Sequence, residues 1–522
     1  MNALTENFAD LSATQLRNGL IAKEFSAMQV AKSAIARVRA CDTHVNAFLE
    51  ITEDLAYSQA KMLDDMIAEG RAQELPILAG TVSGFKDNMN LVGTKTTCSS
   101  KLLENYTSPY TATCVSKMLS AGVIPMGKLN MDEFAFGSST ETSAFGPSKN
   151  PWDLTRVPGG SSGGSVAAVA AGMAGITLGS DTGGSIRQPG SFCGCVAVKP
   201  TYGMVSRYGV VAFGSSLDQV GPFTHSVQDA ALCMNALVGL DSLDSTSQDC
   251  ECDFKANLNQ GVDGMKIGIV PAFMDAEGLD AEVKQAVLDS VRKLEAQGAE
   301  IVEVELPNAA AAMSAYYVLG PCEAFSNLAR FDAVRYGLRD AKASDLSTMY
   351  ENSRAAGFGK EAQRRILLGA YLLSAGVYDK YYYPAQQVRT LITEDYVNAF
   401  SRVDAILAPV APRTAFKFGE IADPTSMYLS DMFTISINIA GNCAMSLPVG
   451  LGADSQMPIG AQIIGPSFKD ATMLRVAAAL ERSVLAEGVA AHGETAPDFA
   501  CGKLPKMANE KASTNANGKA GA

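Results

Sequence analysis

Histidine is scarce in this chain, whose 522 residues include only His44, His225 and His492. The scarcity matters because histidine is the most frequent general base at neutral pH. His44 follows a predicted helix and His492 lies in a polar C-terminal stretch, so His225 is the one candidate base, and most loop histidines have no catalytic role. Any acid–base chemistry in this chain therefore favours another residue type as the base.

Several other features are missing. No run reaches 18 apolar residues and no signal-peptide pattern opens the chain, so we expect a cytoplasmic protein without a membrane span. The eleven cysteines are scattered without zinc-site spacing, which predicts no metal site and small buried thiols. With Lys+Arg 42 against Asp+Glu 55, the chain is acidic, and this disfavours direct binding of nucleic-acid phosphates.

No Pro/Ser-rich linker, charge block or repeat of 20–50 residues divides the chain before its end. The apolar content of 47% and charged content of 19% are sufficient for a large core. We therefore predict one large α/β domain over residues 11–498, preceded by a lead-in over 1–10. The small polar residues of 499–522 show no core pattern and predict a disordered tail.

Two glycine–serine clusters, residues 159–165 and 181–185, flank an Ala/Val/Met run. The run predicts a short buried helix leading into a buried strand. Glycine lets a substrate approach the backbone closely, and the clusters add serine hydroxyls. Acyl-transfer chemistry needs this combination of amide donors beside a nucleophile.

These clusters allow three other interpretations. A single cluster is often only a packing loop, but two clusters around one core segment are less typical of packing alone. Phosphate binding is disfavoured because neither a Gly-Lys-Ser/Thr ending nor G-x-G-x-x-G spacing is present. A G-x-S-x-G nucleophile elbow needs a preceding strand, and none fits before Pro158. The elbow would also leave residues 181–185 without a role.

Lys86 is the leading candidate for a base other than histidine. It follows the apolar run 77–82, and burial lowers the pKa of a lysine toward neutrality. We expect a strand, a loop carrying Lys86 and a second short strand within 77–92. The polar and aromatic segment 131–157 is expected to lie across the pocket.

The remaining chain shows helical and strand periodicities. Ser12 is a predicted N-cap at the start of amphipathic helices over 11–40. The other expected helices are 111–120, 280–297, several over 309–398, and 472–487. The other expected strands are 121–128, 265–270, 301–304, 403–408 and 457–464.

The context G-x-K-D-N at Lys86, GGSSGGS at 159–165 and DTGGSIRQP at 181–189 resemble the amidase signature family, as does the spacing of 24 residues from Ser161 to Ser185. Segments 131–153, 199–231 and 316–332 resemble one branch of that family, the A subunits of tRNA-dependent amidotransferases. The resemblance covers roughly residues 10–485. It implies a single domain with a central mixed β-sheet covered by helices on both faces.

The resemblance also implies a catalytic triad in which Ser185 is the nucleophile, Ser161, on a cis peptide, relays the proton, and Lys86 is the base. Ser162 is expected to be a hydrogen-bonding neighbour. The backbone N–H groups implied as the oxyanion hole are those of Thr182, Gly183, Gly184 and Ser185.

The implied substrate is glutamine, with Arg365 binding its carboxylate, Asp431 its ammonium group and Tyr316 hydrogen-bonding to it. The implied activity is release of ammonia from glutamine. The implied partners are the B and C subunits of a heterotrimer. The larger of them would use the ammonia, with ATP and Mg²⁺, to amidate Glu-tRNA(Gln) or Asp-tRNA(Asn). No cofactor is expected in this chain. The alternatives are a stand-alone amidase acting on another amide and a non-catalytic scaffold.

Overall fold

The computed structural model describes residues 8, 11–250 and 252–486. The predicted tail over 499–522 and nearly all of the lead-in over 1–10 lie outside these residues. Within the described part of the chain, no helix is long and apolar enough to cross a membrane.

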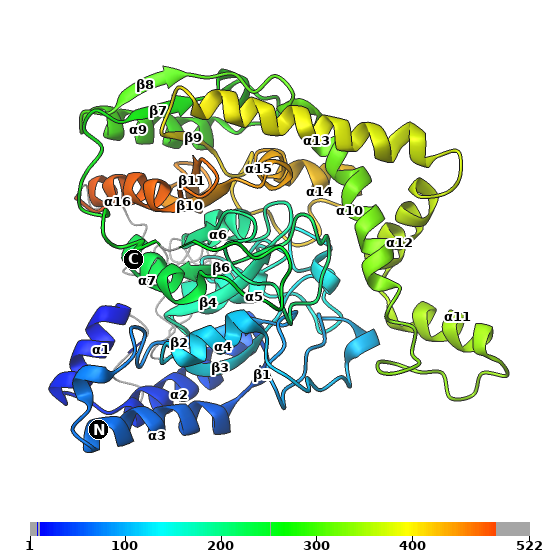
Figure 1. Ribbon diagram of the computed structural model, residues 1–522, viewed down its shortest axis with the longest axis horizontal. Coiled ribbons are helices and arrows are strands. Elements are labelled where there is room, and N and C mark those ends of the chain that lie inside the picture. Colours follow the sequence, from blue (N-terminus) through cyan, green and yellow to red (C-terminus); the bar gives the residue numbers. More distant parts are fainter. Residues whose placement is uncertain (1–7, 9–10, 251, 487–522) are drawn as a thin grey trace, which may run out of the picture.

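The described residues form one eleven-stranded sheet in the order β1-β3-β2-β4-β6-β5-β10-β11-β9-β7-β8 (Figure 1). Parallel pairs join β2 to β3 and β4, and β7 to β8 and β9, whereas the other neighbours are antiparallel. The predicted mixed sheet is therefore confirmed. The strands are β1 (Phe48–Ile51), β2 (Val82–Lys86), β3 (Ile124–Leu129), β4 (Ile176–Asp181), β5 (Val196–Lys199), β6 (Gln219–Thr224), β7 (Lys266–Ile269), β8 (Glu300–Glu303), β9 (Ala405–Pro409), β10 (Cys443–Leu451) and β11 (Pro458–Gly465).

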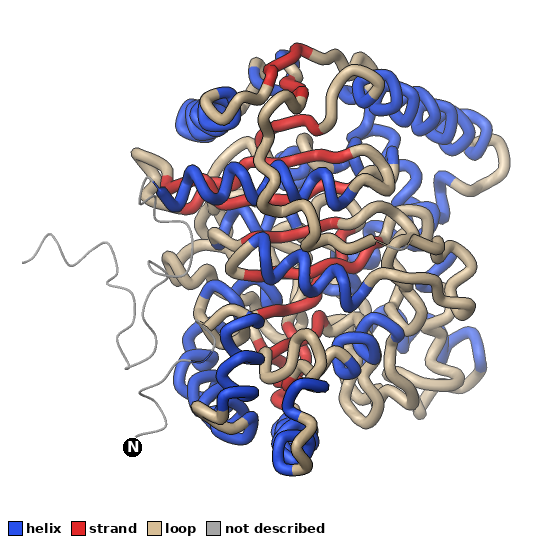
Figure 2. Tube along the Cα trace, turned by 60° about the vertical axis from the view of Figure 1, so that its left-hand side comes forward, coloured by secondary structure: helices blue, strands red, loops and turns tan. Residues whose placement is uncertain are grey.

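Helices pack along this sheet (Figure 2). The longer ones are α1 (Ala13–Ala22), α2 (Ala27–Val45), α3 (Glu53–Ala68), α4 (Thr113–Ser120), α5 (Gly163–Ala170), α6 (Arg187–Cys193), α7 (Val227–Leu237), α9 (Ala281–Glu295), α10 (Ala312–Leu328), α11 (Leu346–Gly357), α12 (Lys360–Leu372), α13 (Tyr378–Phe400) and α16 (Asp470–Ala486). The short ones are α8 (Pro271–Met274), α14 (Pro424–Tyr428) and α15 (Ile435–Ala440).

Strand β10 shows that both faces of the sheet are covered. Its residues Met445 and Leu447 join the apolar core under α16, whereas Ser446, between them, faces Gly190 of α6. Because successive side chains of a strand point to opposite faces, α6 and α16 lie on opposite sides of the sheet. The predicted two-sided covering is confirmed.

Helices α10, α11 and α12 form an extension at the right of Figure 1, and α13 runs along the top of the molecule to meet them. Within it, α10 and α12 lie so close that a Cβ added at Gly369 would collide with the Pro321 carbonyl oxygen. This contact fixes the two helices as a pair, and each of them carries residues of the pocket described below.

Most predicted elements are present, with small shifts in their ends. Ser12 caps α1 in a capping box with Gln15, as expected. The prediction for 77–92 is wrong in its details: residues 77–80 form a turn, Lys86 ends strand β2 instead of lying in a loop, and the described residues after it form a turn instead of a second strand. Strand β10 was missed because Pro448 and Gly450 interrupt its apolar run at a register shift.

Candidate active site

The sheet brings Lys86 and the two serine clusters to one edge. Strands β2 and β4 are parallel neighbours, so Lys86, the last residue of β2, and Asp181, the last of β4, lie at the same carboxyl end. Ser185 follows β4 in the turn that leads into α6. Ser161 precedes α5, which packs on β2 and β4. Carboxyl ends of parallel strands are common locations of catalytic sites because the loops that follow them converge there.

Lys86 is fully buried, and its Nζ lies 2.7 Å from Ser161 Oγ, 2.9 Å from Ser162 Oγ and 3.2 Å from the Ser180 carbonyl oxygen. Burial lowers the pKa of Lys86 from 10.5 to about 7, although nearby carboxylates, Asp132 foremost, oppose the shift. A substantial fraction of this lysine is therefore neutral at physiological pH and able to accept a proton.

The two serines beside Lys86 differ in their other contacts. Ser162 Oγ donates to the Ser180 carbonyl at 3.1 Å and accepts from the Ser180 N–H at 3.3 Å, so the backbone of β4 occupies it. Ser161 follows a cis peptide bond from Gly160, and its hydroxyl pairs with Lys86. Ser161 is thus the hydroxyl free to exchange a proton with Lys86 and a further group.

The turn that carries Ser185 is held by a buried ion pair. Arg187 Nε and Nη2 donate to the two carboxylate oxygens of Asp181 at 3.1 and 3.0 Å. Burial alone would raise the pKa of Asp181, but the Arg187 guanidinium outweighs it and holds this pKa at about 2. The permanent charge of Asp181 lets it accept backbone N–H groups of the turn, among them Ile186 at 3.1 Å.

One of these N–H groups corrects the expected oxyanion hole. Gly184 N–H donates to Asp181 Oδ1 at 2.8 Å, so it is committed to shaping the turn. Within the described chain, the N–H groups of Thr182, Gly183 and Ser185 donate to no acceptor. Gly184 also has a φ of +140°, a conformation that strongly favours glycine.

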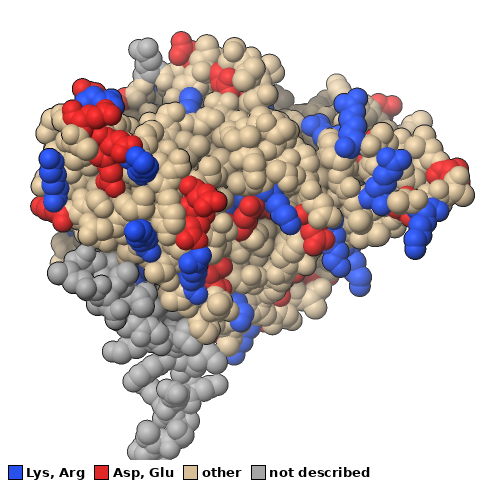
Figure 3. All heavy atoms as spheres, turned by 90° about the horizontal axis from the view of Figure 1, so that it is seen from below, with Lys and Arg blue, Asp and Glu red and all other residues tan. Residues whose placement is uncertain are grey.

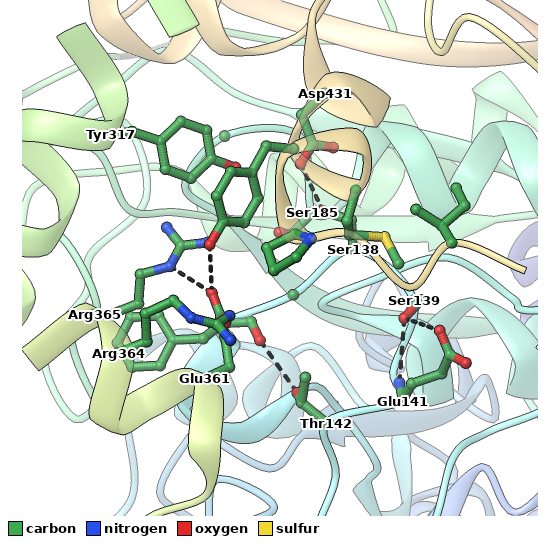
Figure 4. A pocket seen from close by; sticks show the side chains of 18 of the residues that line it. Ser138, Ser139, Glu141, Thr142, Ser185, Tyr317, Glu361, Arg364, Arg365 and Asp431 are labelled. Atoms are coloured by element: carbon green, nitrogen blue, oxygen red, sulfur yellow. Dashed lines mark hydrogen bonds and ion pairs between the residues drawn. The ribbon is translucent and has the colours of Figure 1, made fainter. Parts of the chain in front are cut away.

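A pocket of about 230 Å³ opens in front of Ser185 (Figure 4). Ser185 and Gly183 line one wall, and Tyr316, Tyr317 and Arg365 of α10 and α12 line another. Residues 135–139 and 141–142 form part of the lining, which confirms the expected position at the pocket for this part of segment 131–157. Lys86 and Ser161 are buried behind Ser185.

Of the adjacent residues Arg364 and Arg365, Arg365 is the buried one. Its side chain is 5% exposed, against 49% for Arg364, and both bind Glu361. Arg365 Nε donates to Glu361 Oε1 at 2.7 Å, and the guanidinium lies 4.7 and 4.5 Å from the ring centroids of Tyr317 and Tyr428. Since Nε is engaged, the Nη edge of the guanidinium remains for an anionic ligand.

Asp431 lies across the pocket from Arg365 (Figure 4). Ser138 Oγ donates to Asp431 Oδ2 at 2.6 Å, and the buried Oδ1 has no hydrogen-bond partner among the described residues. Burial raises the pKa of Asp431 to about 7. Tyr316 packs against Gly183. A Cβ added at Gly183 would come within 2.9 Å of the ring and hydroxyl of Tyr316. The pocket thus holds a cation and a carboxyl group at separate positions.

Sequence reasoning missed several residues of this pocket. Glu361, Tyr317, Tyr428 and Ser138 were not proposed, although the Glu361–Arg365 spacing of four residues is a helical ion-pair signal that could have found the first. The contact between Ser138 and Asp431 joins residues 293 apart in the chain, and no local sequence pattern predicts it.

The chain is similar to known proteins along most of its length. The family model described as Amidase matches residues 29–474. The A subunit of glutamyl-tRNA(Gln) amidotransferase from Carboxydothermus hydrogenoformans is 52% identical over 91% of this chain and 97% of its own, and that from Gloeobacter violaceus is 51% identical over 90% and 96%.

Comparison with solved structures gives the same result. The crystal structure of the A subunit of glutamyl-tRNA(Gln) amidotransferase from Thermotoga maritima superposes with a TM-score of 0.75 at 39% identity, covering 91% of this chain and 95% of that one. The native peptide amidase from Stenotrophomonas maltophilia gives 0.77 at 26% identity, over 92% and 98%. The chain shares its fold with these structures, matches the family model over most of its length and is about half identical to the relatives named above. It therefore belongs to the amidase family.

Proposed function

We propose that this chain is the glutamine-hydrolysing component of a tRNA-dependent amidotransferase. The observation that carries the proposal is a fully buried lysine with a pKa near 7, in contact with a serine behind a pocket that contains Arg365 and Asp431. The relatives named as the A subunit of glutamyl-tRNA(Gln) amidotransferase support it, since they are about half identical over almost their whole length.

In the proposed reaction, neutral Lys86 accepts a proton from Ser161, which accepts one from Ser185. The Ser185 oxygen then attacks the side-chain amide carbon of glutamine. The N–H groups of Thr182, Gly183 and Ser185 stabilise the oxyanion, and Gly184 N–H is left out because Asp181 accepts it. The C–N bond breaks, the nitrogen takes the proton and leaves as ammonia, and water hydrolyses the acyl ester to release glutamate.

The two charged groups of the pocket suit the two charges of a free amino acid. Arg365 offers its Nη edge to the α-carboxylate, and Asp431 offers the unpartnered Oδ1 to the α-ammonium group. Tyr316, packed on Gly183 of the oxyanion turn, hydrogen-bonds to the bound substrate. A hydrophobic or uncharged amide would leave Asp431 Oδ1 and the Nη edge of Arg365 without a ligand, which is costly for buried polar groups.

The acceptor reaction belongs to other polypeptides in this proposal. The B subunit would bind ATP, Mg²⁺ and Glu-tRNA(Gln) or Asp-tRNA(Asn), and a small C subunit would complete the heterotrimer. The charge of −13 supports this division. On the face seen in Figure 3, acidic and basic side chains are interspersed among mostly uncharged residues.

A stand-alone amidase acting on another amide is the second candidate, favoured by the likeness to peptide amidase. Affinity purification from the native cell, followed by mass spectrometry and an amide-hydrolysis assay, separates the two. We expect co-purifying amidotransferase subunits and preferred hydrolysis of glutamine. A chain that purifies alone and prefers a peptide amide would contradict the proposal.

The substitution Arg365→Lys is expected to raise the KM for glutamine roughly tenfold or more, because lysine keeps the charge but loses the planar fork. The measurement is steady-state glutaminase kinetics. Arg364→Lys is the matched control, since Arg364 is half exposed, and we expect a smaller change in KM. A larger effect for Arg364→Lys would contradict the assignment of Arg365.

The KM for glutamine is expected to rise as the pH falls below about 7. Burial raises the pKa of Asp431 to about 7, so acid converts the free carboxylate to the neutral form, which binds an ammonium group poorly. Measuring KM between pH 5.5 and 8.5 in the wild type and Asp431→Asn tests this. The variant should have a high KM that no longer changes across this range, and an unchanged pH dependence in it would refute the role of Asp431.

A further inference from the structure

Glu133 is a buried carboxylate that the proposed reaction does not use. It is 2% exposed and begins the short helix η4 (Glu133–Ala135) behind the pocket wall. Both of its oxygens accept the backbone N–H of Gly359, Oε2 at 2.8 Å and Oε1 at 3.0 Å. Gly359 is the N-cap residue of α12, the helix that carries Arg365.

The contact between Glu133 and Gly359 is tightly packed. A Cβ added at Gly359 would collide with Glu133 Oε2. Ser100 Oγ lies 2.5 Å from Glu133 Oε1 and 3.1 Å from the carbonyl oxygen of Gly357, the last residue of α11. The rings of Phe134 and Phe358 pack beside it with centroids 5.4 Å apart. Glu133 therefore binds the junction between α11 and α12 from within the pocket-lining segment.

The backbone of η4 shows that this arrangement is imposed by its surroundings. Phe134 and Ala135 have φ values of +48° and +66°, a left-handed conformation that non-glycine residues adopt at a cost. Such strained residues persist only where contacts hold them, and they gather at functional sites. Ala135 and the four residues after it, 136–139, line the pocket.

Helix α12 is thus fixed at two points, and Arg365 lies between them. Its start is bound to Glu133, and Gly369 is pressed against Pro321 of α10. Arg365 is six residues after Gly359, about 9 Å along the helix axis at ~1.5 Å per residue. A carboxylate that accepts an N–H group at a helix start also interacts favourably with the helix dipole.

We infer that Glu133 is a positioning residue for substrate recognition: by holding the N-terminus of α12 against the segment beside Ser138, it sets the place of Arg365 relative to Ser185. The inference rests on the proposed glutaminase function. Glu133 acts through α12 and does not touch the substrate. Its loss should therefore weaken binding of the α-carboxylate and spare the serine chemistry.

The test uses Glu133→Gln and Gly359→Ala in the full-length chain co-expressed with its partner subunits. Glutamine keeps the shape of Glu133 but loses the charge and one acceptor, and the added methyl of Gly359→Ala pushes on the same contact from the other side. We expect each variant to raise the KM for glutamine roughly tenfold with kcat changed less than about twofold. Asp345→Asn, which alters the N-cap of α11 away from the pocket lining, is the matched control and should change neither constant.

A second substrate separates positioning from general damage. 4-Aminobutanamide is glutamine without its α-carboxylate, so its kcat/KM should be unchanged in Glu133→Gln. Unchanged KM for glutamine in both variants, or a loss of kcat without a rise in KM, would overturn the inference; the KM-against-kcat split decides even if the second substrate reacts too slowly. Failure of the wild-type complex to hydrolyse glutamine would instead overturn the proposed function.

Discussion

Ser185→Ala abolishes glutamine-dependent amidation of tRNA by the reconstituted complex but leaves ammonium-dependent amidation intact: this is the expected result with the largest effect. Glutaminase activity should fall by at least about 10⁴-fold, since loss of a nucleophile removes the whole relay. Ammonium supplied with ATP bypasses Ser185 because the acceptor chemistry is assigned to another polypeptide. The measurement is amidated tRNA formed with each nitrogen source.

The control for this experiment is Ser401→Ala, at an exposed serine just after α13. It should support amidation from both nitrogen sources. Loss of both activities in Ser185→Ala, with the complex still assembled, would mean that this chain also performs the transfer. Retained activity from glutamine would mean that Ser185 is not the nucleophile.

Replacement of Lys86 is expected to be almost as severe. Lys86→Ala removes the only hydrogen-bond partner of Ser161 Oγ among the described residues, so glutaminase activity should fall by at least about a thousandfold. Lys86→Arg tests why: it keeps a positive charge but cannot become neutral, so it should be equally inactive if Lys86 acts as a base. Substantial activity in Lys86→Arg would show that only the charge is needed.

The pH profile gives an independent measure of the same role. Burial lowers the pKa of Lys86 to about 7, and the neutral form is the base, so kcat of the wild type should rise with pH and level off above about 7. If Asp431 binds the ammonium group as proposed, it stays ionised in the complex with glutamine, so the kcat profile reports Lys86 alone. A kcat that stays constant from pH 5.5 to 8.5 would contradict a lysine base.

The candidate catalytic residues of this protein could be predicted from contiguous motifs. A serine nucleophile needs glycine-rich backbone and amide donors beside it, and these are local features that 159–165 and 181–185 display in the sequence. Lys86 followed from the lack of histidine and from the apolar run before it. The contact between Lys86 and Ser161, at 2.7 Å, agrees with the relay that the family resemblance implies.

Local reasoning was less successful where a short motif could be read in two ways. The chain around Lys86 was predicted as a loop between two strands, but Lys86 is the last paired residue of β2. The family resemblance implied four backbone N–H donors in the glycine-rich turn. A motif contains the donors but not their directions, and in the folded turn the Gly184 N–H points to Asp181.

Other features depend on packing between distant segments. The sequence does not distinguish Arg364 from Arg365. Only the rotation of α12 against α10 buries Arg365 and exposes Arg364. The link from Glu133 to Gly359 spans 226 residues, and that from Ser138 to Asp431 spans 293. Residue types and spacings determine which reactive groups the chain contains, because both are set by its covalent structure. Which groups meet, and which remain free for a substrate, is decided by tertiary packing, because a hydrogen bond needs its two atoms about 3 Å apart.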